Sequence, residues 1–502
     1  MEKPNTNMEI SRLLEYGLQR GLIAPEDKAY AANRMLALLD LREFEPQPVE
    51  EELHTPVEPL ERLCQFAAEA GLIDPDTRDG RDQFDTELMN CLMPRPSQVV
   101  REFYSLYEKD KQAATDYYYQ LARSSNYIRV DRIEKDRMWT APTPYGDLVI
   151  TINLSKPEKD PKAIAAAKNA PQSGYPKCAL CRENEGYLGS ANQAARGNHR
   201  LIPLELGGEP WFLQYSPYVY YNEHCIVLSH EHRPMKVSRQ SISRLLEFVT
   251  FLPHYFVGSN ADLPIVGGSI LTHDHFQGGR YEFPMAKAPI REKVCFPGFE
   301  DVEAGIVHWP MSVIRLRGKE AQRLVDLADK ILTAWREYSD ESAEILAYTE
   351  GTPHNTITPI ARRRGEDYEL DLVLRNNRTT PEHPLGLFHP HAEYHHIKKE
   401  NIGLIEVMGL AILPPRLLTE TGLLEQALKD PAQAQEIMAR PEMEKHQAWY
   451  EELKAAGAGE GDTQRAIQES IGVIFGKILG NAGVYKDTEE GREAFRRFCS
   501  SL

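Results

Sequence analysis

The spacing of apolar residues changes near residue 126, and this change sets the strongest limit on the fold. Before it, apolar side chains recur at helical spacing, as in EISRLLEYGLQRGLI (9–23). After it come short β-branched runs typical of strands, interrupted by two amphipathic segments with helical spacing, 238–256 and 320–338. The strand candidates lie within 127–154 and at 200–206, 211–221, 224–232, 263–276, 308–318, 354–364, 368–377 and 385–396. From about 417, charged helical sequence returns.

This order of elements predicts an α+β protein with four parts. They are a helical N-terminal domain (1–125), a first α+β half (126–300), a second α+β half (301–416) and a helical C-terminal extension (417–502). A length of 502 residues also favours two or three packed units over a single domain.

The N-terminal domain contains a weak internal echo. YGLQRGLIAPED (16–27) resembles FAAEAGLIDPDT (66–77), which predicts two similar helix-turn-helix units. The acidic, proline-bearing segment 42–61 between them reads as a linker or a long surface loop. We interpret this domain as a packing or dimerisation unit, since nothing in it resembles a site.

Charge and composition narrow the function. A formal net charge of −17 argues against a general nucleic-acid or membrane-surface binder. No stretch approaches the roughly 20 apolar residues needed to span a bilayer, and the N-terminus does not read as a secretion signal. Seven cysteines with one close pair favour a reducing cytoplasm. We therefore expect a cytoplasmic protein that binds neither membrane nor nucleic acid.

GGSILTHDHFQGG (267–279) is the first candidate site. If 269–277 is a strand, its alternation places His273, His275 and Gln277 on one face and Asp274 and Phe276 on the other. The glycines that follow allow close backbone approach to a ligand. The alternative is a solvated strand of alternating polarity, which the apolar residues just before the motif disfavour.

CALC (178–181) is the second candidate site. Cys178 and Cys181 have the spacing that chelates one tetrahedral zinc through both thiolates, with His232 and His273 as candidates for the remaining ligands. A redox dithiol is the competing interpretation, and it would favour cysteines at the start of a helix in a thioredoxin-like setting. A third interpretation is that the two cysteines have no chemical function.

LFHPHAEYHHIKKEN (387–401) is the third cluster. As a strand it would place His389, His391, Glu393 and His395 on one face. Such a face fits a metal or phosphate site and fits equally a polar seam between subunits.

Together these segments, LSHEHRP (228–234) and residues 374–414 resemble the galactose-1-phosphate uridylyltransferases, specifically their second type, over essentially the whole chain. The resemblance implies a histidine-triad fold of two half-barrel repeats. It also implies UDP-glucose and galactose 1-phosphate as substrates. We further expect a homodimer.

The resemblance also implies roles for individual residues. The first type of the family carries His-Pro-His-Gly-Gln, with the second histidine as nucleophile, and the matching segment here begins at His273. The implied nucleophile is His275, and Gln277 binds phosphate. Asn260 and Ser269 match nucleotide phosphate contacts. The implied ligands of a structural zinc are Cys178, Cys181, His232 and His273.

This sequence departs from the first type at several points. Asp274 replaces the proline, and the segment before the motif has one residue more. A literal His-Pro-His at 389–391 lacks the following glutamine, so we do not assign the nucleophile there. A second metal of the first type would map to His389 and His391, with His354 as a guess for a third ligand. No hexose contact can be carried over.

The chemistry expected at His275 is nucleotidyl transfer. A neutral imidazole attacks phosphorus near neutral pH, because its ordinary pKa is about 6.5. We expect a uridylyl-histidine formed from UDP-glucose and then attacked by galactose 1-phosphate. Two alternatives stay open: a dinucleoside polyphosphate phosphorylase or hydrolase of the same superfamily, and a zinc-dependent binding or scaffold protein.

Overall fold

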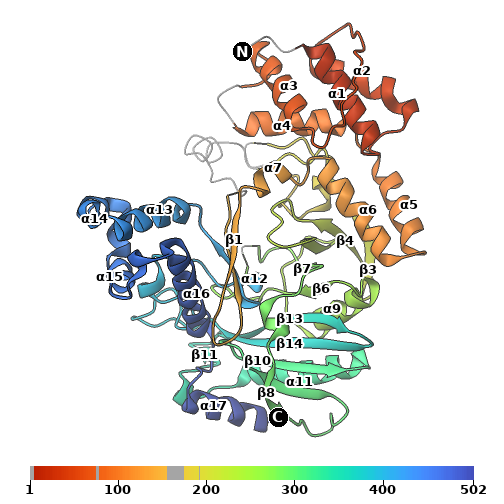
Figure 1. Cartoon of the computed structure of the whole chain (residues 1–502). Coiled ribbons are helices and arrows are strands. Elements are labelled where there is room, and N and C mark those ends of the chain that lie inside the picture. The colour runs from red at the N-terminus through yellow and green to blue at the C-terminus, as the bar shows by residue number, and fades with distance from the viewer. Residues whose placement is uncertain (1–4, 75–77, 155–173, 191–192, 269) are drawn as a thin grey trace. The chain divides into compact units, whose positions relative to one another are not determined.

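The structure is a computed structural model, and it describes residues 5–74, 78–154, 174–190, 193–268 and 270–502 (Figure 1). The chain divides into two compact units. Unit 1 comprises Met1–Glu134, Lys156–Val219 and Glu223–Arg233, and unit 2 comprises Lys135–Ser155, Tyr220–Asn222 and Pro234–Leu502. The four-part division expected from the sequence stays a prediction, because compactness alone does not establish independent folding.

Unit 1 begins with two helix pairs of similar construction. Their bounds are α1 (Thr6–Gln19) with α2 (Lys28–Leu38), and α3 (Val57–Glu69) with α4 (Arg78–Asn90). The first helix of each pair ends before a glycine in the left-handed region, Gly21 (φ +67°) and Gly71 (φ +72°), where a side chain would be strained. The Gly-Leu-Ile sequence repeated in the two pairs therefore corresponds to the same type of helix C-terminus. The turn after Gly71 lies partly outside the described residues.

The rest of unit 1 joins helices to a short antiparallel sheet. Its elements are α5 (Pro96–Tyr107), α6 (Lys111–Ser124), α7 (Val130–Ile133), β3 (Ile202–Leu206), β4 (Glu209–Tyr215) and β5 (Cys225–Ser229), with the strands in the order β3-β4-β5. Tyr215 on β4 donates its hydroxyl to the carbonyl of Thr115 on α6 at 3.1 Å. Tyr127 donates in turn to the Tyr215 carbonyl at 3.0 Å. These buried tyrosines fix the helices to the sheet.

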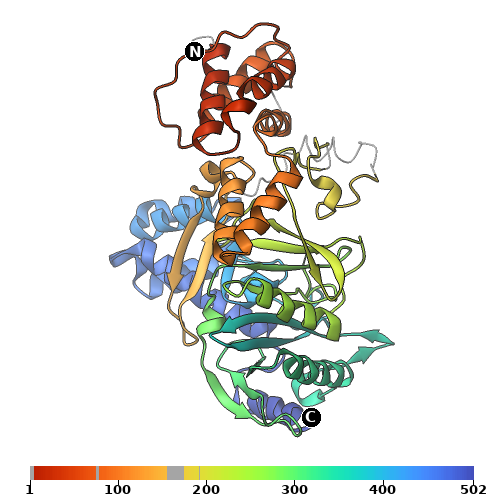
Figure 2. The same ribbon diagram turned by 90° about the vertical axis from the view of Figure 1, so that its right-hand side faces the viewer.

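Unit 2 is built on antiparallel strands in the order β7-β6-β13-β14-β10-β9-β8. Their bounds are β6 (Phe256–Gly258), β7 (His275–Gly279), β8 (Ile290–Val294), β9 (Glu303–Val307), β10 (Val313–Gly318), β13 (Asn355–Arg364) and β14 (Asp367–Asn376). Helices α9 (Arg239–Phe251) and α11 (Ala321–Glu337) contact these strands (Figures 1 and 2). Both helices were predicted, and α9 begins at the N-cap Ser238, whose side chain accepts from the Ser241 N–H.

A second, smaller sheet of unit 2 packs against these strands. A three-stranded sheet in the order β1-β2-β15 shares one apolar core with Phe256, Ile360 and Val373 of the main sheet. The remaining elements of the unit are β1 (Arg137–Ala141), β2 (Leu148–Ile152), α10 (Pro284–Lys287), β11 (Tyr348–Thr349), β12 (Thr352–Pro353), α12 (Leu404–Val407), β15 (Leu410–Leu413), α13 (Arg416–Lys429), α14 (Pro431–Met438), α15 (Gln447–Ala455), α16 (Thr463–Ala482) and α17 (Glu489–Ser500). The mixed α and β composition and the helical C-terminal region agree with the sequence.

Two strand predictions are wrong. Residues 387–401 form turns and one short 3-10 helix (Ala392–Tyr394), so His389, His391, Glu393 and His395 share no strand face. Pro390 explains the difference, since it cannot donate to a ladder. The predicted strand 269–277 begins only at His275. Within the residues that the structure describes, no helix is long and apolar enough to cross a bilayer.

Candidate active site and metal centre

His273 and His275 differ in local structure although one residue separates them. His273 and Asp274 lie in the irregular segment before β7, and His275 is the first residue of the strand. Strand alternation therefore does not apply to His273 and Asp274, both of which are buried. From His275 onward the predicted alternation holds, with the buried Phe276 between His275 and Gln277.

The ring of His275 is buried and oriented by the backbone. Its Nδ1 lies 2.8 Å from the carbonyl oxygen of His273, which can only accept, so Nδ1 carries the proton. Nε2 then holds the lone pair. Burial lowers the pKa of His275 to about 4. The geometry thus presents a neutral imidazole with a defined nucleophilic nitrogen.

The register of the sheet places Gln277 next to Gly258, a position that has no side chain. Gln277 pairs with Gly258 on β6, and Gly258 pairs with Ile360 on β13, so the three positions share a face. A Cβ at Gly258 would lie 2.8 Å from the Leu404 side chain. The missing side chain lets Leu404 pack directly on the strand next to Gln277.

Asn260 follows β6, and its amide is held in one orientation. Its Oδ1 accepts from the backbone N–H of Leu404 at 2.9 Å, which leaves Nδ2 as a donor. A Cβ at Gly268 would lie 2.6 Å from that Nδ2. One glycine of the sequence motif is thus required by its contact with Asn260. Ser269, the other predicted phosphate contact, lies outside the described residues.

The two cysteines lie close to the predicted histidines. The Sγ atoms of Cys178 and Cys181 are 3.6 Å apart, and Nδ1 of His232 is 3.2 Å from Sγ of Cys181. One ligand atom each from Cys178, Cys181, His232 and His273 lies within 4.8 Å of all the others. The four residues predicted to bind one metal therefore form a cluster.

The donor set of this cluster fits zinc. Two sulfur and two imidazole nitrogen ligands are a standard tetrahedral combination for Zn²⁺. Asn184 holds the turn, since its Nδ2 donates to the carbonyls of Cys178 and Cys181 at 2.8 Å each. The cysteines precede only a single 3-10 turn (Arg182–Asn184), not the α-helix that a redox dithiol favours.

The third histidine cluster is engaged within its own loop. His389 Nε2 lies 3.1 Å from Oδ1 of Asn401, and His391 stacks on His383 with 4.1 Å between ring centroids. His354, the guess for a third ligand, has Nδ1 2.8 Å from Oδ1 of Asn377. Across the described ranges, no group of three clustered metal ligands includes these histidines. The second metal finds no ligand set there.

Arg375 is a buried residue near Asn260 that the sequence interpretation missed. It lies on β14 with 1% of its surface exposed, and burial lowers its pKa to about 10. Its Nη2 donates to the carbonyl of Ile402 at 2.8 Å, two residues before the Leu404 N–H that Asn260 accepts. Both residues hold the same loop against the sheet. An arginine inside the apolar run YELDLVLRNN was the available signal.

Comparison with known proteins shows the family of the chain. The family model described as galactose-1-phosphate uridyl transferase, N-terminal domain, matches residues 21–234, and the C-terminal domain model matches residues 247–448. The chain belongs to the galactose-1-phosphate uridyl transferase family. The segment 273–277 lies inside the C-terminal match, and the cysteine pair lies inside the N-terminal match.

Members of the galactose-1-phosphate uridyl transferase family are similar to the chain over its full length. It is 52% identical to the galactose-1-phosphate uridylyltransferase of Clostridium acetobutylicum over 498 residues, covering 99% of this chain and 100% of that protein. It is 53% identical to that of Halalkalibacterium halodurans over 506 residues, covering 100% of both. It is 52% identical to the galactose-1-phosphate uridylyltransferase of Bacillus subtilis, covering 98% of this chain and 97% of that protein. A crystal structure of yeast Ap4A phosphorylase aligns with TM-score 0.31 and 13% identity over 60% of this chain and 90% of that one.

Proposed function

We propose that this protein transfers a uridylyl group from UDP-glucose to galactose 1-phosphate through a covalent intermediate on His275. The observation that carries the proposal is the contact between His275 Nδ1 and the His273 carbonyl, which leaves Nε2 as the nucleophilic nitrogen. Membership in the galactose-1-phosphate uridyl transferase family supplies the substrate class.

The reaction has two balanced steps. Nε2 of His275 attacks the α-phosphorus of UDP-glucose, and the bond from that phosphorus to the β-phosphate oxygen breaks, releasing glucose 1-phosphate. A phosphate oxygen of galactose 1-phosphate then attacks the same phosphorus, the P–N bond breaks, and UDP-galactose leaves. The proton on Nδ1 stays hydrogen-bonded to His273 throughout, so it stabilises the positive charge that develops on the ring.

Gln277 and Asn260 act as neutral hydrogen-bond donors to the phosphoryl oxygens. Gln277 lies two residues after the nucleophile on the same strand face. The Nδ2 of Asn260 remains for a ligand because Oδ1 is bonded to Leu404. A neutral donor stabilises charge that develops at an oxygen without first forming an ion pair with the substrate. Ser269 is proposed as a further phosphate contact from the sequence alone.

Cys178, Cys181, His232 and His273 would hold a structural zinc. When bound, such a zinc supplies no reacting group and fixes its ligands in place. His273 is the residue whose carbonyl orients His275, so restraining it restrains the nucleophile.

Fold details and assembly complete the proposal. The two α+β halves correspond to histidine-triad-like half-barrels with helical additions at both ends, divided near residues 125, 300 and 416. The protein acts as a homodimer in the cytoplasm, with UDP-glucose and galactose 1-phosphate as its small-molecule partners. The proposal includes a single metal, because among the described residues no group of three clustered ligands includes His389 or His391.

An acceptor comparison tests the function. Purified protein is mixed with UDP-glucose and either galactose 1-phosphate, inorganic phosphate or water, and the products are separated by chromatography. The proposal predicts UDP-galactose with galactose 1-phosphate and little turnover with the other two acceptors. Faster turnover with phosphate or water would instead indicate a phosphorylase or hydrolase. No turnover with any acceptor would favour a binding protein.

A further inference from the structure

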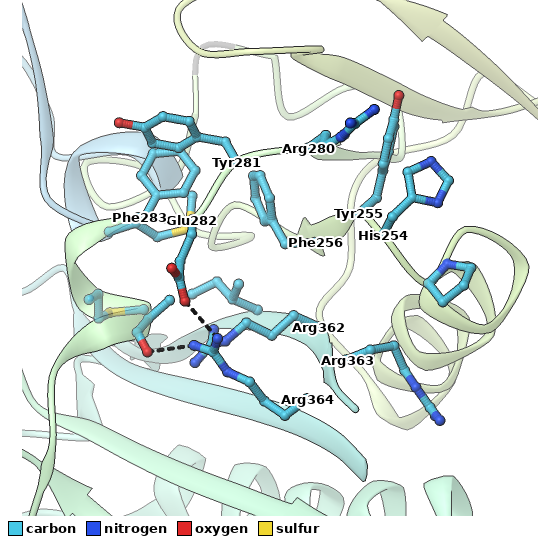
Figure 3. Close-up of a pocket in the computed structure, with 15 residues that line it drawn as sticks. His254, Tyr255, Phe256, Arg280, Tyr281, Glu282, Phe283, Arg362, Arg363 and Arg364 are labelled. Atoms are coloured by element: carbon cyan, nitrogen blue, oxygen red, sulfur yellow. Dashed lines mark hydrogen bonds and ion pairs between the residues drawn. The ribbon is translucent and has the colours of Figure 1, made fainter. Parts of the chain in front are cut away.

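A cavity of about 300 Å³ lies in unit 2 (Figure 3). Its walls come from residues 253–256, which lead into β6, residues 280–286 after β7, and residues 360–364 at the end of β13. Because β6 and β7 are antiparallel, the start of β6 and the end of β7 lie at one edge. His275 and Asn260 lie at the opposite edge. Five residues from His275 to Arg280 correspond to roughly 15 Å along the strand.

Positive charge gathers at this cavity, although the whole chain has a net charge of −17. Its lining includes Arg280, Arg362, Arg363 and Arg364 but only one carboxylate, Glu282. Glu369 and Asp371, which lie behind the wall, are bonded to Arg362, Arg364 and Arg315. Even without Arg280, the four arginines Arg315, Arg362, Arg363 and Arg364 outnumber these three carboxylates, and the excess of positive charge attracts an anion.

Two nitrogens of the Arg362 guanidinium are held by carboxylates, and the third remains available to a ligand. Its Nε donates to Glu369 and its Nη2 to Asp371, each at 2.7 Å, and 7% of the residue is exposed. Asp371 is held from the other side by Arg315 at 2.7 Å. Among the described residues, Nη1 of Arg362 has no hydrogen-bond partner. A guanidinium held this way loses little entropy when an anion binds it.

The single carboxylate in the lining does not oppose an anion. Glu282 is bonded to Nη1 of Arg364 at 2.6 Å, and this hydrogen bond lowers the pKa of Glu282 (Figure 3). Arg364 uses its other nitrogens on Glu369 and on the carbonyl of Ala286. Arg364 therefore neutralises Glu282, whereas Arg362 keeps a free donor.

One wall of the cavity is aromatic. Phe283 packs edge-on against Phe256 and Tyr281, with ring centroids 5.1 and 4.7 Å apart. Met285 and Met408 also line the cavity. Aromatic rings and thioethers form a firm apolar surface on which a planar ring can stack. The cavity thus pairs an anion donor with an apolar wall in a volume at the lower end of small-molecule sites.

We propose that this cavity binds a phosphate monoester that carries a planar ring, of the size of a nucleoside monophosphate. The phosphate contacts Nη1 of Arg362, and the ring lies against Phe256, Tyr281 and Phe283. This site is separate from His275, so it does not depend on the proposed reaction.

A matched pair of variants tests the proposal, with uridine monophosphate as the probe in isothermal titration calorimetry. Arg362→Gln and Arg315→Gln each remove one of the two arginines that hold Asp371, so their effects on folding should be similar. Only Arg362 lines the cavity. We expect Arg362→Gln to weaken binding at least about tenfold, the scale of a lost charged hydrogen bond, and Arg315→Gln to change it little. Any binding at the catalytic site contributes equally to both variants.

Two further arms complete the test. Inorganic phosphate lacks the ring and uridine lacks the phosphate, so each should bind more weakly than uridine monophosphate. Ala286→Leu fills the cavity without changing charge, and it should weaken binding while uridylyl transfer continues; it replaces Arg362→Gln if that variant does not fold. Equal losses in Arg362→Gln and Arg315→Gln, unchanged binding in Ala286→Leu, or either fragment binding as tightly as the nucleotide would overturn the proposal.

Discussion

The Nδ1 of His275 lies 2.8 Å from the carbonyl oxygen of His273. One backbone contact thus sets the tautomer of the ring, because a carbonyl accepts only from a protonated nitrogen. The residue that supplies the carbonyl also belongs to the cluster of four residues that could hold a metal ion. The proposed metal site and the proposed nucleophile are therefore joined through the three consecutive residues 273–275.

Replacing Gln277 should slow the chemical step without unfolding the protein. Gln277→Ala removes one neutral donor to the phosphoryl group, and losing one such donor lowers kcat by on the order of 10²-fold. Steady-state kinetics with both substrates measure the loss, and thermal melting checks the fold. Gln277→Glu should be at least as slow, since it places a negative charge beside the phosphate. A kcat near that of the unaltered protein in Gln277→Ala would remove this role.

Gly268→Ala tests the close approach to Asn260. The added methyl would lie 2.6 Å from Nδ2 of Asn260, so the amide must move or release Leu404. We expect kcat/KM to fall about tenfold, as for the loss of one oriented hydrogen bond. Gly422→Ala is the control, because nothing lies within 4 Å of the methyl that it adds. Equal kinetics in the two variants would mean that the orientation of Asn260 does not matter.

Metal content can be tested independently of activity. We expect one zinc per chain by elemental analysis, lost in Cys181→Ser and kept in Cys64→Ser, which replaces a buried cysteine outside the cluster. A chelator should lower the melting temperature together with turnover, because metal binding contributes to folding. Fully active protein without any metal would refute the zinc centre.

The buried His199 predicts a pH dependence of stability. Burial lowers its pKa to about 3, and its ring lies against Tyr127 with Nε2 3.0 Å from Oε1 of Gln214. The unfolded chain binds a proton at His199 below about pH 6.5, whereas the folded chain does not. Stability therefore falls as the pH drops from about 6.5 towards 3, by about 1.4 kcal/mol per pH unit for this one group.

Comparing variants by urea unfolding isolates that contribution. His199→Gln should lose this part of the pH dependence, so the free-energy difference between it and the unaltered protein shrinks as the pH falls from 6 to 4. His54→Gln, at an exposed position, should follow the unaltered protein. Parallel curves for His199→Gln and the unaltered protein would contradict the account.

Features decided by neighbouring residues were predictable from the sequence. The start of α9 at Ser238 and the end of α1 before Gly21 follow from local hydrogen bonds and glycine geometry. The alternation from His275 to Gln277 follows from strand periodicity. The four residues that the family resemblance implied as zinc ligands, Cys178, Cys181, His232 and His273, do cluster, although they come from three distant segments.

Features that depend on pairing between distant segments were not predictable. The pattern of apolar residues does not reveal the bend before His275. The predicted strand was therefore too long at its start, and His273 lies outside β7. Arg362 and Arg280 reach one cavity only because β13 and β7 both pair with β6. The role of Arg375 likewise requires the loop at Ile402, which the chain reaches 27 residues later. Without a register, these arginines read as ordinary charges in strands.

The mass of the intact protein after mixing with UDP-glucose alone tests the central claim most directly. Without an acceptor, the first step should leave a uridylyl group on the protein, and denaturing mass spectrometry should show that mass added once per chain. Peptide mapping should place it on His275, and the His275→Ala variant should show no addition and at least about a thousandfold loss of turnover. Active protein that gains no mass, or gains it at another residue, would contradict the assignment of His275 as the nucleophile.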